Sequence, residues 1–88
     1  MRITERDLEA TIARINRATG NHYSPCTKKA DGTFTANIGN YHLSCAYGGV
    51  ALHQMSEGGE VRDIFGGHMP KKELYNLMHA YLMGMEAV

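Results

Sequence analysis

A chain of 88 residues, of which 43% are hydrophobic, has room for one small domain with one core, so we expect residues 1–88 to form a single domain. Nine basic and nine acidic residues give a formal charge of zero, which excludes the strong positive field typical of nonspecific nucleic-acid binders. Apolar runs fall far short of the roughly 20 residues that cross a bilayer, and two cysteines do not make a disulfide scaffold, so we expect no membrane partner and a reducing cytoplasm.

The N-terminal segment predicts a helix over about residues 5–18. Thr4 can accept a hydrogen bond from the backbone of the first turn, and Asp7 three residues later completes the pattern of a capping box. Apolar residues then recur at the spacing of one helical face: Leu8, Ile12 and Ile15. Gly20 is typical of the residue that ends a helix in a left-handed conformation.

The middle of the chain predicts antiparallel strands. Residues 20–32 lack periodicity and are rich in turn-forming residues, so we expect an ordered loop there. Apolar and polar residues alternate over residues 33–38, and Gly39-Asn40 can supply the positive φ values of a tight hairpin turn. This pattern predicts that residues 33–38 pair with the strand that follows the turn.

Two further alternating stretches follow, residues 41–47 and 50–55, separated by the glycine pair Gly48-Gly49. Together with the preceding strand they predict a three-stranded meander. Residues 61–65 contain two β-branched residues and an aromatic, which predicts a short fourth strand at an edge of the sheet.

The C-terminal segment carries the clearest helical pattern of the chain. Pro70 suits the first turn of a helix, because its missing N–H would have no partner there. The apolar residues form one wide face: Leu74, Leu77, Met78, Tyr81, Leu82 and Met85. The element order α-β-β-β-(β)-α predicts a two-layer α+β fold, in which an antiparallel sheet of three or four strands packs on two helices. The expected core residues are Leu8, Ile12, Ile15, Phe34, Ile38, Leu43, Val50, Leu52, Leu74, Leu77, Met78, Tyr81 and Leu82.

Residues 66–72, which we name the helix entrance, are a candidate ligand site. Lys71 and Lys72 at a helix N-terminus oppose the helix dipole, at a cost of roughly a few tenths of a kcal/mol each. Free backbone N–H groups after the glycines would join the lysines and His68 in a cradle for an anion such as phosphate. The candidate anion-binding residues are Gly67, His68, Lys71 and Lys72. The alternative is that both lysines point into water.

The outer face of the predicted sheet is a second candidate site. If the leucines of the sheet define its inner face, His42, Ser44 and His53 face outward and offer a polar surface able to bind a protein, a nucleotide or nucleic acid. The candidate partner-surface residues are Tyr41, His42, Tyr47 and His53. The alternative is a solvated sheet face whose tyrosines pack at the margin of the core.

The sequence carries no Walker loop, no Gly-x-Ser-x-Gly, no His-Glu-x-x-His and no paired carboxylates. Two pairs stand near the spacing of metal ligands, His22 with Cys26 and His42 with Cys45. The second pair lies at odd separation on one predicted strand, so its side chains would point to opposite faces. We therefore expect no metal, no cofactor and no enzymatic activity.

Motifs spread over nearly the whole chain carry a resemblance to a known class of proteins. They are Arg14-Ile15-Asn16-Arg17-Ala18-Thr19-Gly20, Asp31-Gly32, the run from Ala36 to Val50, and Gly66-x-His68-x-Pro70-Lys71-x-Glu73-Leu74. With these motifs the chain resembles small accessory proteins of tailed bacteriophages and prophages. The resemblance implies a protein of the host-cell cytoplasm that modifies host processes or counters host defence. A second, topological similarity is to the double-stranded-RNA-binding domain, whose last helix also has a basic start.

We expect a noncatalytic phage accessory protein that binds and inhibits or modulates a host macromolecule, most directly a host protein, as an anti-CRISPR-like inhibitor of defence would. Two alternatives stay open. One is a binder of a nucleotide or phosphorylated signal at Gly66–Lys72, and the other is a nucleic-acid module in which Lys71 and Lys72 contact two phosphates. Because so small a chain buries only about 60–65% of its unfolded surface, a homo-oligomer would add stabilising burial.

Overall fold

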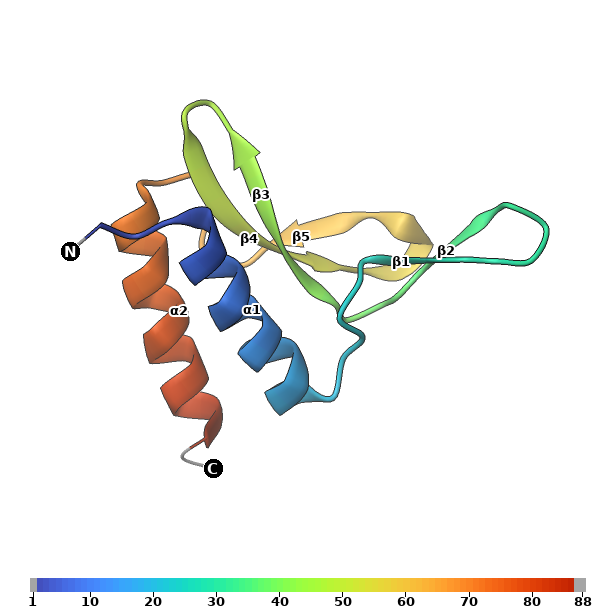
Figure 1. The fold of residues 1–88 in the computed structure, drawn as a ribbon, viewed down its shortest axis with the longest axis horizontal. Helices are drawn as coiled ribbons and strands as arrows, with labels where there is room; N and C mark the ends of the chain where they lie inside the picture. The colour runs from blue at the N-terminus through green and yellow to red at the C-terminus, as the bar shows by residue number, and fades with distance from the viewer. Residues whose placement is uncertain (1, 87–88) are drawn as a thin grey trace.

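The computed structural model describes residues 2–86, and this part of the chain contains two helices, five short strands and one 3₁₀ turn (Figure 1). In chain order the elements are α1 (Glu5–Thr19), β1 (Cys26–Lys28), β2 (Phe34–Ala36), β3 (Tyr41–Ala46), β4 (Gly49–Met55), η1 (Glu57–Gly59), β5 (Val61–Asp63) and α2 (Lys71–Glu86). The chain is an α+β protein, as the order of its predicted elements indicates. No helix among the described residues is long and apolar enough to cross a membrane.

Strands β3, β4 and β5 form an antiparallel sheet in that order. The two helices lie side by side, with α1 packed on β3 and α2 packed on β4 (Figure 1). Strands β1 and β2 form a separate antiparallel ribbon that projects from the rest of the molecule (Figure 1). The molecule with this ribbon has extents of 45 × 35 × 21 Å. The predicted layer of two helices on an antiparallel sheet is confirmed, while the strands that make up the sheet differ in part from the prediction.

The limits of α1 follow from the capping residues that the sequence predicts. Thr4 Oγ1 accepts the backbone N–H of Asp7 at 3.2 Å, and Asp7 Oδ2 accepts the N–H of Thr4 at 2.9 Å, which completes a capping box. Gly20 ends the helix with a φ of +73°, and its N–H donates to the carbonyl of Arg17 at 3.3 Å. The predicted helix is confirmed and is one residue longer at its C-terminal end.

The core lies between the helices and one face of β3 and β4. Its buried residues are Ile3, Leu8, Ile12, Ile15, Tyr41, Val50, Leu52, Leu74, Met78 and Leu82. Leu43 and Tyr81, which the sequence also predicts for the core, are partly buried and pack against it. Leu77 is exposed. Its assignment to the core is wrong, because the part of α2 that α1 and the sheet cover is narrower than the apolar stripe of the helix.

The predicted pairing of residues 33–38 with β3 is wrong. β2 pairs instead with β1, which forms within the segment predicted as a loop. Asn37 supplies the physical reason, since its backbone N–H donates to the carbonyl of Pro25 at 2.8 Å and its Nδ2 donates to the carbonyl of Ser24 at 2.9 Å. These bonds hold the end of β2 against the preceding loop, and alternation alone does not specify which strand is the partner.

Phe34 and Ile38 consequently leave the predicted core, and they are 67% and 62% exposed. The Gly39-Asn40 pair does not close a hairpin between β2 and β3. The N–H of Gly39 donates to the carbonyl of Met55, and the N–H of Met55 donates to the carbonyl of Asn40, both at 2.8 Å. These residues therefore extend the ladder of β3 with β4, and β2 points away from the sheet.

The fourth strand is present at the edge of the sheet, as predicted, and spans Val61–Asp63 rather than the longer predicted stretch. The chain then stays beside β4. The N–H of Ile64 donates to the carbonyl of Leu52 at 3.0 Å, and Val50 and Met69 exchange two backbone hydrogen bonds of 2.8 Å. This second contact brings the helix entrance against the start of β4.

Candidate functional site

The outer face of the sheet, away from the core, carries a histidine from each of its two long strands. His42 of β3 stands opposite His53 of β4, and their ring centroids lie 5.8 Å apart. The neighbouring cross-strand pair, Leu43 and Leu52, packs into or against the core. Since side chains alternate along a strand, the two histidines face outward.

A third histidine joins them from the helix entrance. His68 Nε2 lies 3.0 Å from Ser44 Oγ, and its ring centroid lies 5.9 Å from that of His53. The ring centroid of Tyr47 lies 5.6 Å from that of His68. Tyr47, His68, His53 and His42 therefore form a continuous row of rings, which we name the histidine row. In the sequence these residues fall into two separate candidate sites, and the fold brings them together.

Burial and one carboxylate set the charge of the histidine row. Desolvation by burial lowers the pKa of His42 below its ordinary value, and the charge of His53 lowers it further. His53 Nε2 in turn lies 3.7 Å from Asp63 Oδ2. Burial acts to raise the pKa of Asp63, but hydrogen bonds from the backbone N–H groups of Gly67 and Gly66 outweigh it and lower the pKa. At neutral pH the row thus combines a neutral His42 with a negative Asp63.

The glycines of the helix entrance already bind a carboxylate of the chain itself, because the N–H of Gly66 donates to Asp63 Oδ1 at 2.9 Å. His68 points to the histidine row, whereas Lys71 lines a different hollow beside α1. Lys72 is exposed. The structure therefore does not gather the predicted anion-binding residues around one ligand. These residues are Gly67, His68, Lys71 and Lys72.

Tyr41 is not part of a partner surface, contrary to the prediction. It is only 5% exposed, and its hydroxyl oxygen lies 2.7 Å from that of Tyr81 in α2. Burial, together with the hydrogen bond to Tyr81, raises the pKa of Tyr41 to about 12. Tyr41 shares the inner face with Leu43, whereas Tyr47 has a φ of +53° at the turn after β3 and is 96% exposed. Equal parity along the sequence therefore does not place the two tyrosines on one face.

The two His and Cys pairs do not assemble into a site. His42 belongs to the histidine row, whereas Cys45 Sγ points toward α1 and lies 3.9 Å from Glu5 Oε1. Among residues 2–86 no group of three or more His, Cys, Asp or Glu side chains is arranged to hold a metal ion. Desolvation and the charge of Glu5 raise the pKa of the Cys45 thiol, which reduces the fraction of reactive thiolate.

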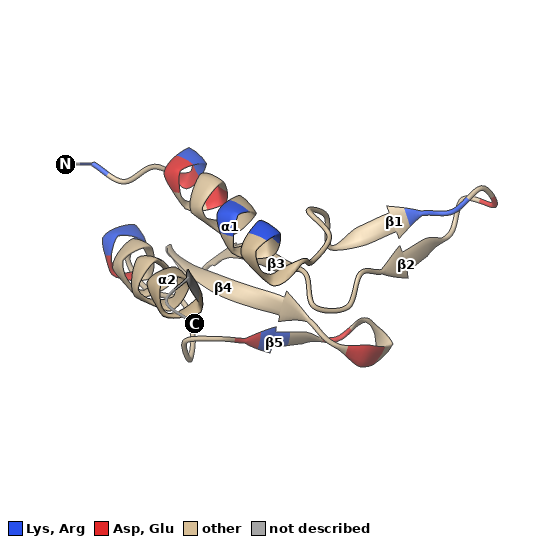
Figure 2. Cartoon of the chain, turned by 90° about the horizontal axis from the view of Figure 1, so that it is seen from below, with Lys and Arg blue, Asp and Glu red and all other residues tan. Residues whose placement is uncertain are grey.

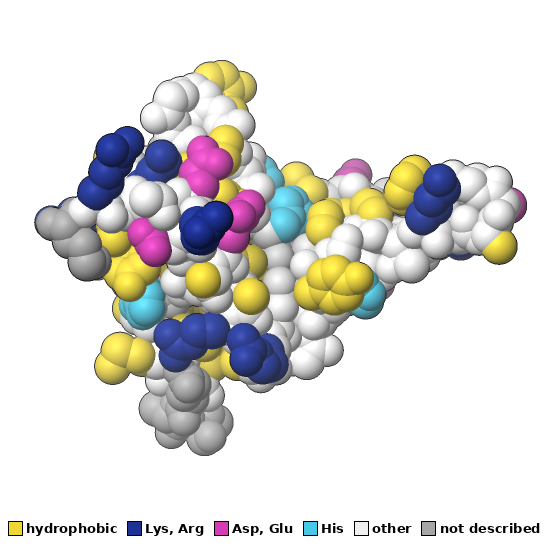
Figure 3. Space-filling view, viewed as in Figure 1, with side chains coloured by type: hydrophobic (Ala, Val, Ile, Leu, Met, Phe, Trp, Pro, Cys, Tyr) yellow, Lys and Arg dark blue, Asp and Glu magenta, His cyan; other side chains and the backbone are white. Residues whose placement is uncertain are grey.

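The β1–β2 ribbon has an apolar face that sequence reasoning did not assign to a site. Cross-strand partners share a face, so Cys26 and Ala36 lie on the same side as Lys28 and Phe34. Phe34 is mostly exposed, and so is Ile38 just after β2. Figure 3 shows hydrophobic side chains along the projecting ribbon. The alternation that misassigned Phe34 and Ile38 to the core was the signal that could have found this face.

Asparagine side chains attach the ribbon to the rest of the molecule. Beside the bonds of Asn37, Asn40 Nδ2 donates to the carbonyl of His22. Asn16 of α1 donates from Nδ2 to the carbonyl of Tyr41 at 2.9 Å, and its Oδ1 accepts the N–H of Tyr41 at 2.8 Å. We name Asn16, Asn37 and Asn40 the asparagine junction. Asn16 and Asn40 are buried, so their bonds are shielded from water. The bonds of Asn16 join α1 to the start of β3, and the bond of Asn40 holds the base of the ribbon beside that strand.

The tip of the ribbon satisfies its own hydrogen bonds. The N–H of Lys29 donates to the carbonyl of Thr33 at 2.7 Å, and the N–H of Gly32 donates to the carbonyl of Lys29 at 3.0 Å. Asp31 Oδ1 accepts both the N–H and the hydroxyl of Thr33, at 3.0 and 2.7 Å. Lys28, Lys29 and Asp31 lie in this part of the sequence, and Figure 2 shows charged residues at this end of the ribbon, whereas β3 and β4 carry none.

No family model matches the chain, and neither a curated protein nor a solved structure matches it. The structure offers two surfaces of different chemistry, namely the polar, largely half-buried histidine row and the apolar, exposed face of the ribbon. Exposed aromatic and aliphatic side chains on a projecting element are typical of protein interfaces, so the ribbon is the better candidate for contact with another protein.

Proposed function

We propose that this chain is a noncatalytic phage or prophage accessory protein that binds a host protein and inhibits or modulates it, in the manner of an anti-defence factor. The observation that supports the proposal is the exposed apolar face of the β1–β2 ribbon. A two-stranded ribbon gains little stability by itself in water. Large apolar side chains on such an element contribute more when a partner covers them than when they stay in solvent.

The chemistry of the ribbon indicates the kind of surface that it fits. Phe34 and Ile38 would each contribute about 1.5–3 kcal/mol when fully buried against a partner. Lys28 shares the face of Phe34, and Lys29 follows at the tip, so the complementary surface is an apolar groove with an acidic rim. Because each strand of the ribbon has three residues, one face offers little area for a stable interface, which buries roughly 800 Å² per partner. A groove that receives both sides of the ribbon supplies the missing area, which favours insertion into a partner over flat pairing.

The asparagine junction supports the same proposal, because it orders the ribbon before any partner is present. Ordering a flexible segment on binding costs free energy, and a segment that is already held in its binding geometry avoids that cost. The side chains of Asn37 and Asn40, which follow β2, donate to the carbonyls of Ser24 and His22, which precede β1. These bonds join the two sides of the ribbon base to each other. The ribbon is therefore presented in one direction relative to the helices and the sheet.

The nucleotide alternative is less well supported. An anion at the glycines of the helix entrance would have to displace the carboxylate of Asp63 from the N–H of Gly66. The nucleic-acid alternative depends on Lys71 and Lys72, which neutralise two phosphates at most and would give weak binding that falls with salt. Neither alternative explains why Phe34 and Ile38 are exposed on an ordered ribbon.

The test is capture of partners from a lysate of the bacterium that carries the gene, with the wild-type protein and the double variant Phe34→Ser/Ile38→Ser. We expect one host protein at stoichiometric amounts with the wild type, and binding at least about 30-fold weaker with the variant, since an interface anchor contributes about 2 kcal/mol or more.

The matched control is Met83→Ser, which removes a side chain of 69% exposure from α2 instead of from the ribbon. We expect this variant to bind like the wild type. Circular dichroism checks that all three proteins are folded. The proposal is overturned if the wild type captures no stoichiometric partner, or if the control loses binding as much as the ribbon variant does.

A further inference from the structure

A hollow of about 380 Å³ opens between the first turns of the two helices and the hairpin that joins β3 to β4. Its lining residues are Glu5, Cys45, Ala46, Gly48, Gly49, Val50 and Lys71. The volume is at the lower end of the range found for small-molecule sites. This hollow shares no side chain with the histidine row and none with the ribbon, so neither surface accounts for it.

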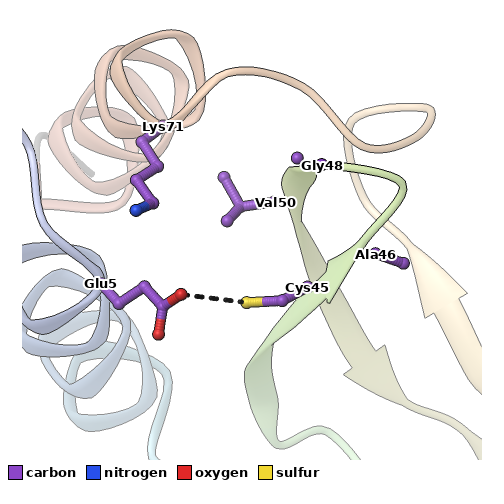
Figure 4. Close-up of a pocket in the computed structure, with 7 residues that line it drawn as sticks. Glu5, Cys45, Ala46, Gly48, Val50 and Lys71 are labelled. Atoms are coloured by element: carbon purple, nitrogen blue, oxygen red, sulfur yellow. Dashed lines mark hydrogen bonds between the residues drawn. The ribbon is translucent and has the colours of Figure 1, made fainter.

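Two opposite charges face the hollow from different helices. Glu5 is the first residue of α1 and Lys71 the first residue of α2, and Figure 4 shows both side chains reaching toward the same space. Among the described residues no ion pair joins them. Both charges act on the thiol of Cys45 across the hollow: burial raises the pKa of this thiol most, Glu5 raises it further, and Lys71 lowers it (Figure 4). The hollow therefore has a negative side and a positive side that do not neutralise each other directly.

The sheet side of the hollow is apolar and tightly held. Val50 is buried below it, while Ala46 lies at its edge with its methyl group directed away (Figure 4). Gly49 has little room for a side chain, because a Cβ there would lie 3.0 Å from the carbonyl oxygen of Met69 and 3.1 Å from its nitrogen, so the backbone of Met69 would have to shift. The contact keeps this wall close to the segment that leads into α2. A ligand would thus meet a fixed apolar wall between two charged side chains.

We propose that this hollow binds a small zwitterion of the α-amino acid class with an aliphatic side chain. The carboxylate of the ligand pairs with the ammonium group of Lys71, and its ammonium group pairs with the carboxylate of Glu5. The aliphatic side chain lies against Val50. A phosphate or other pure anion is disfavoured, because the carboxylate of Glu5 would repel it. This site explains the unusual lysine at the start of α2, whose charge is used toward the ligand.

The test is titration of the wild-type protein with L-leucine, followed by two-dimensional ¹H–¹⁵N NMR at the amides of Gly48 and Gly49. We expect saturable shifts at both amides. N-acetyl-L-leucine lacks the ammonium group and L-leucinamide lacks the carboxylate, so each should bind at least about tenfold more weakly, as expected for loss of one charge-assisted contact.

Variants locate the two ends of the ligand. Glu5→Gln should weaken the binding of L-leucine and leave the binding of N-acetyl-L-leucine unchanged. Lys71→Gln should weaken the binding of L-leucine and leave the binding of L-leucinamide unchanged. Lys72→Gln is the control, since Lys72 does not line the hollow. The proposal is overturned if L-leucine causes no shifts at Gly48 and Gly49 up to its solubility limit, or if the two analogues bind as tightly as L-leucine. The wild-type titration decides even if a variant does not fold.

Discussion

β3 is an edge strand of the sheet, so the backbone of Tyr41 has no neighbouring strand on one side. The side chain of Asn16 takes the place of that strand. Its side-chain amide presents a donor and an acceptor in the geometry of a peptide group, and both are used by the backbone of Tyr41. The residue is 3% exposed, so water is not a ready substitute. One side chain of α1 therefore satisfies the start of an edge strand and joins the helix to the sheet.

We predict that Asn16→Ala destabilises the fold by roughly 2–4 kcal/mol, because it leaves two buried backbone groups without partners at about 1–3 kcal/mol each. Urea unfolding monitored by circular dichroism measures the change in the free energy of unfolding. Asn21→Ala is the matched control, since it removes a hydrogen bond between exposed side chains, from Asn21 Nδ2 to Thr19 Oγ1. It should cost less than about 1 kcal/mol. Equal losses in the two variants would contradict the role of Asn16.

At the scale of elements, the segment between β5 and α2 behaves as an extension of the sheet. Val50 and Met69 exchange backbone hydrogen bonds, and Gly49 lies against the backbone of Met69. This close approach is what delivers His68 to Ser44 and Lys71 to the hollow. Both the histidine row and the proposed zwitterion site therefore depend on one contact between backbones.

We predict that Gly49→Ala destabilises the protein by about 1–3 kcal/mol, as overpacking of a close contact does. Gly84→Ala is the matched control, and we expect it to change the free energy of unfolding in the opposite direction. Gly84 lies inside α2, and a methyl group added there would meet nothing within 4 Å, so this change should stabilise the helix by about 0.5–1 kcal/mol. Thermal unfolding of the two variants measures both effects. A neutral or stabilising Gly49→Ala would show that the contact does not constrain the fold.

For the whole molecule, the balance of charge near neutral pH is sensitive to histidines. The nine basic and nine acidic residues cancel, so the five histidines decide the net charge as the pH falls. Three of them lie in the histidine row, where protonation brings like charges together beside the carboxylate of Asp63. Acidification therefore acts on one face of the sheet more than on the rest of the surface.

We predict a loss of stability on acidification that depends on His42. Its pKa is lowered in the folded state, so the unfolded chain takes up the proton first, near the ordinary histidine value of about 6.5. The contribution is complete above that pH and is lost as the pH falls from there toward the folded pKa. Urea unfolding at a series of pH values between about 7.5 and 5 should show a smaller decrease for His42→Gln than for the wild type. An unchanged pH dependence would contradict the assignment.

Sequence patterns formed by residues a few positions apart were sufficient to predict the two helices. The capping box of Thr4 and Asp7 and the left-handed Gly20 define α1 nearly to the residue. The wide apolar stripe of α2 likewise identifies Leu74, Met78 and Leu82 as core residues. These features depend on residues a few positions apart, which the sequence shows directly.

The sequence did not show which segments far apart in the chain contact each other. Alternation over residues 33–38 is the same whether the strand joins β3 or β1, and the bonds of Asn37 to the preceding loop decide between them. The same holds for the histidine row, because the contact of His68 with Ser44 spans 24 residues. Periodicity could predict which residues of a strand face outward. It could not predict that His68, from the segment before α2, would lie beside them.

The self-contained tip of the ribbon has a consequence for how such a protein can diversify. Residues 29–33 close their own hydrogen bonds, and Asn37 and Asn40 of the asparagine junction hold the base of the ribbon. Substitutions between these two points change the proposed partner surface without touching a residue of the core. The segment can therefore be exchanged as a cassette, with new recognition selected on an unchanged scaffold, and it is the natural place to graft a foreign binding sequence.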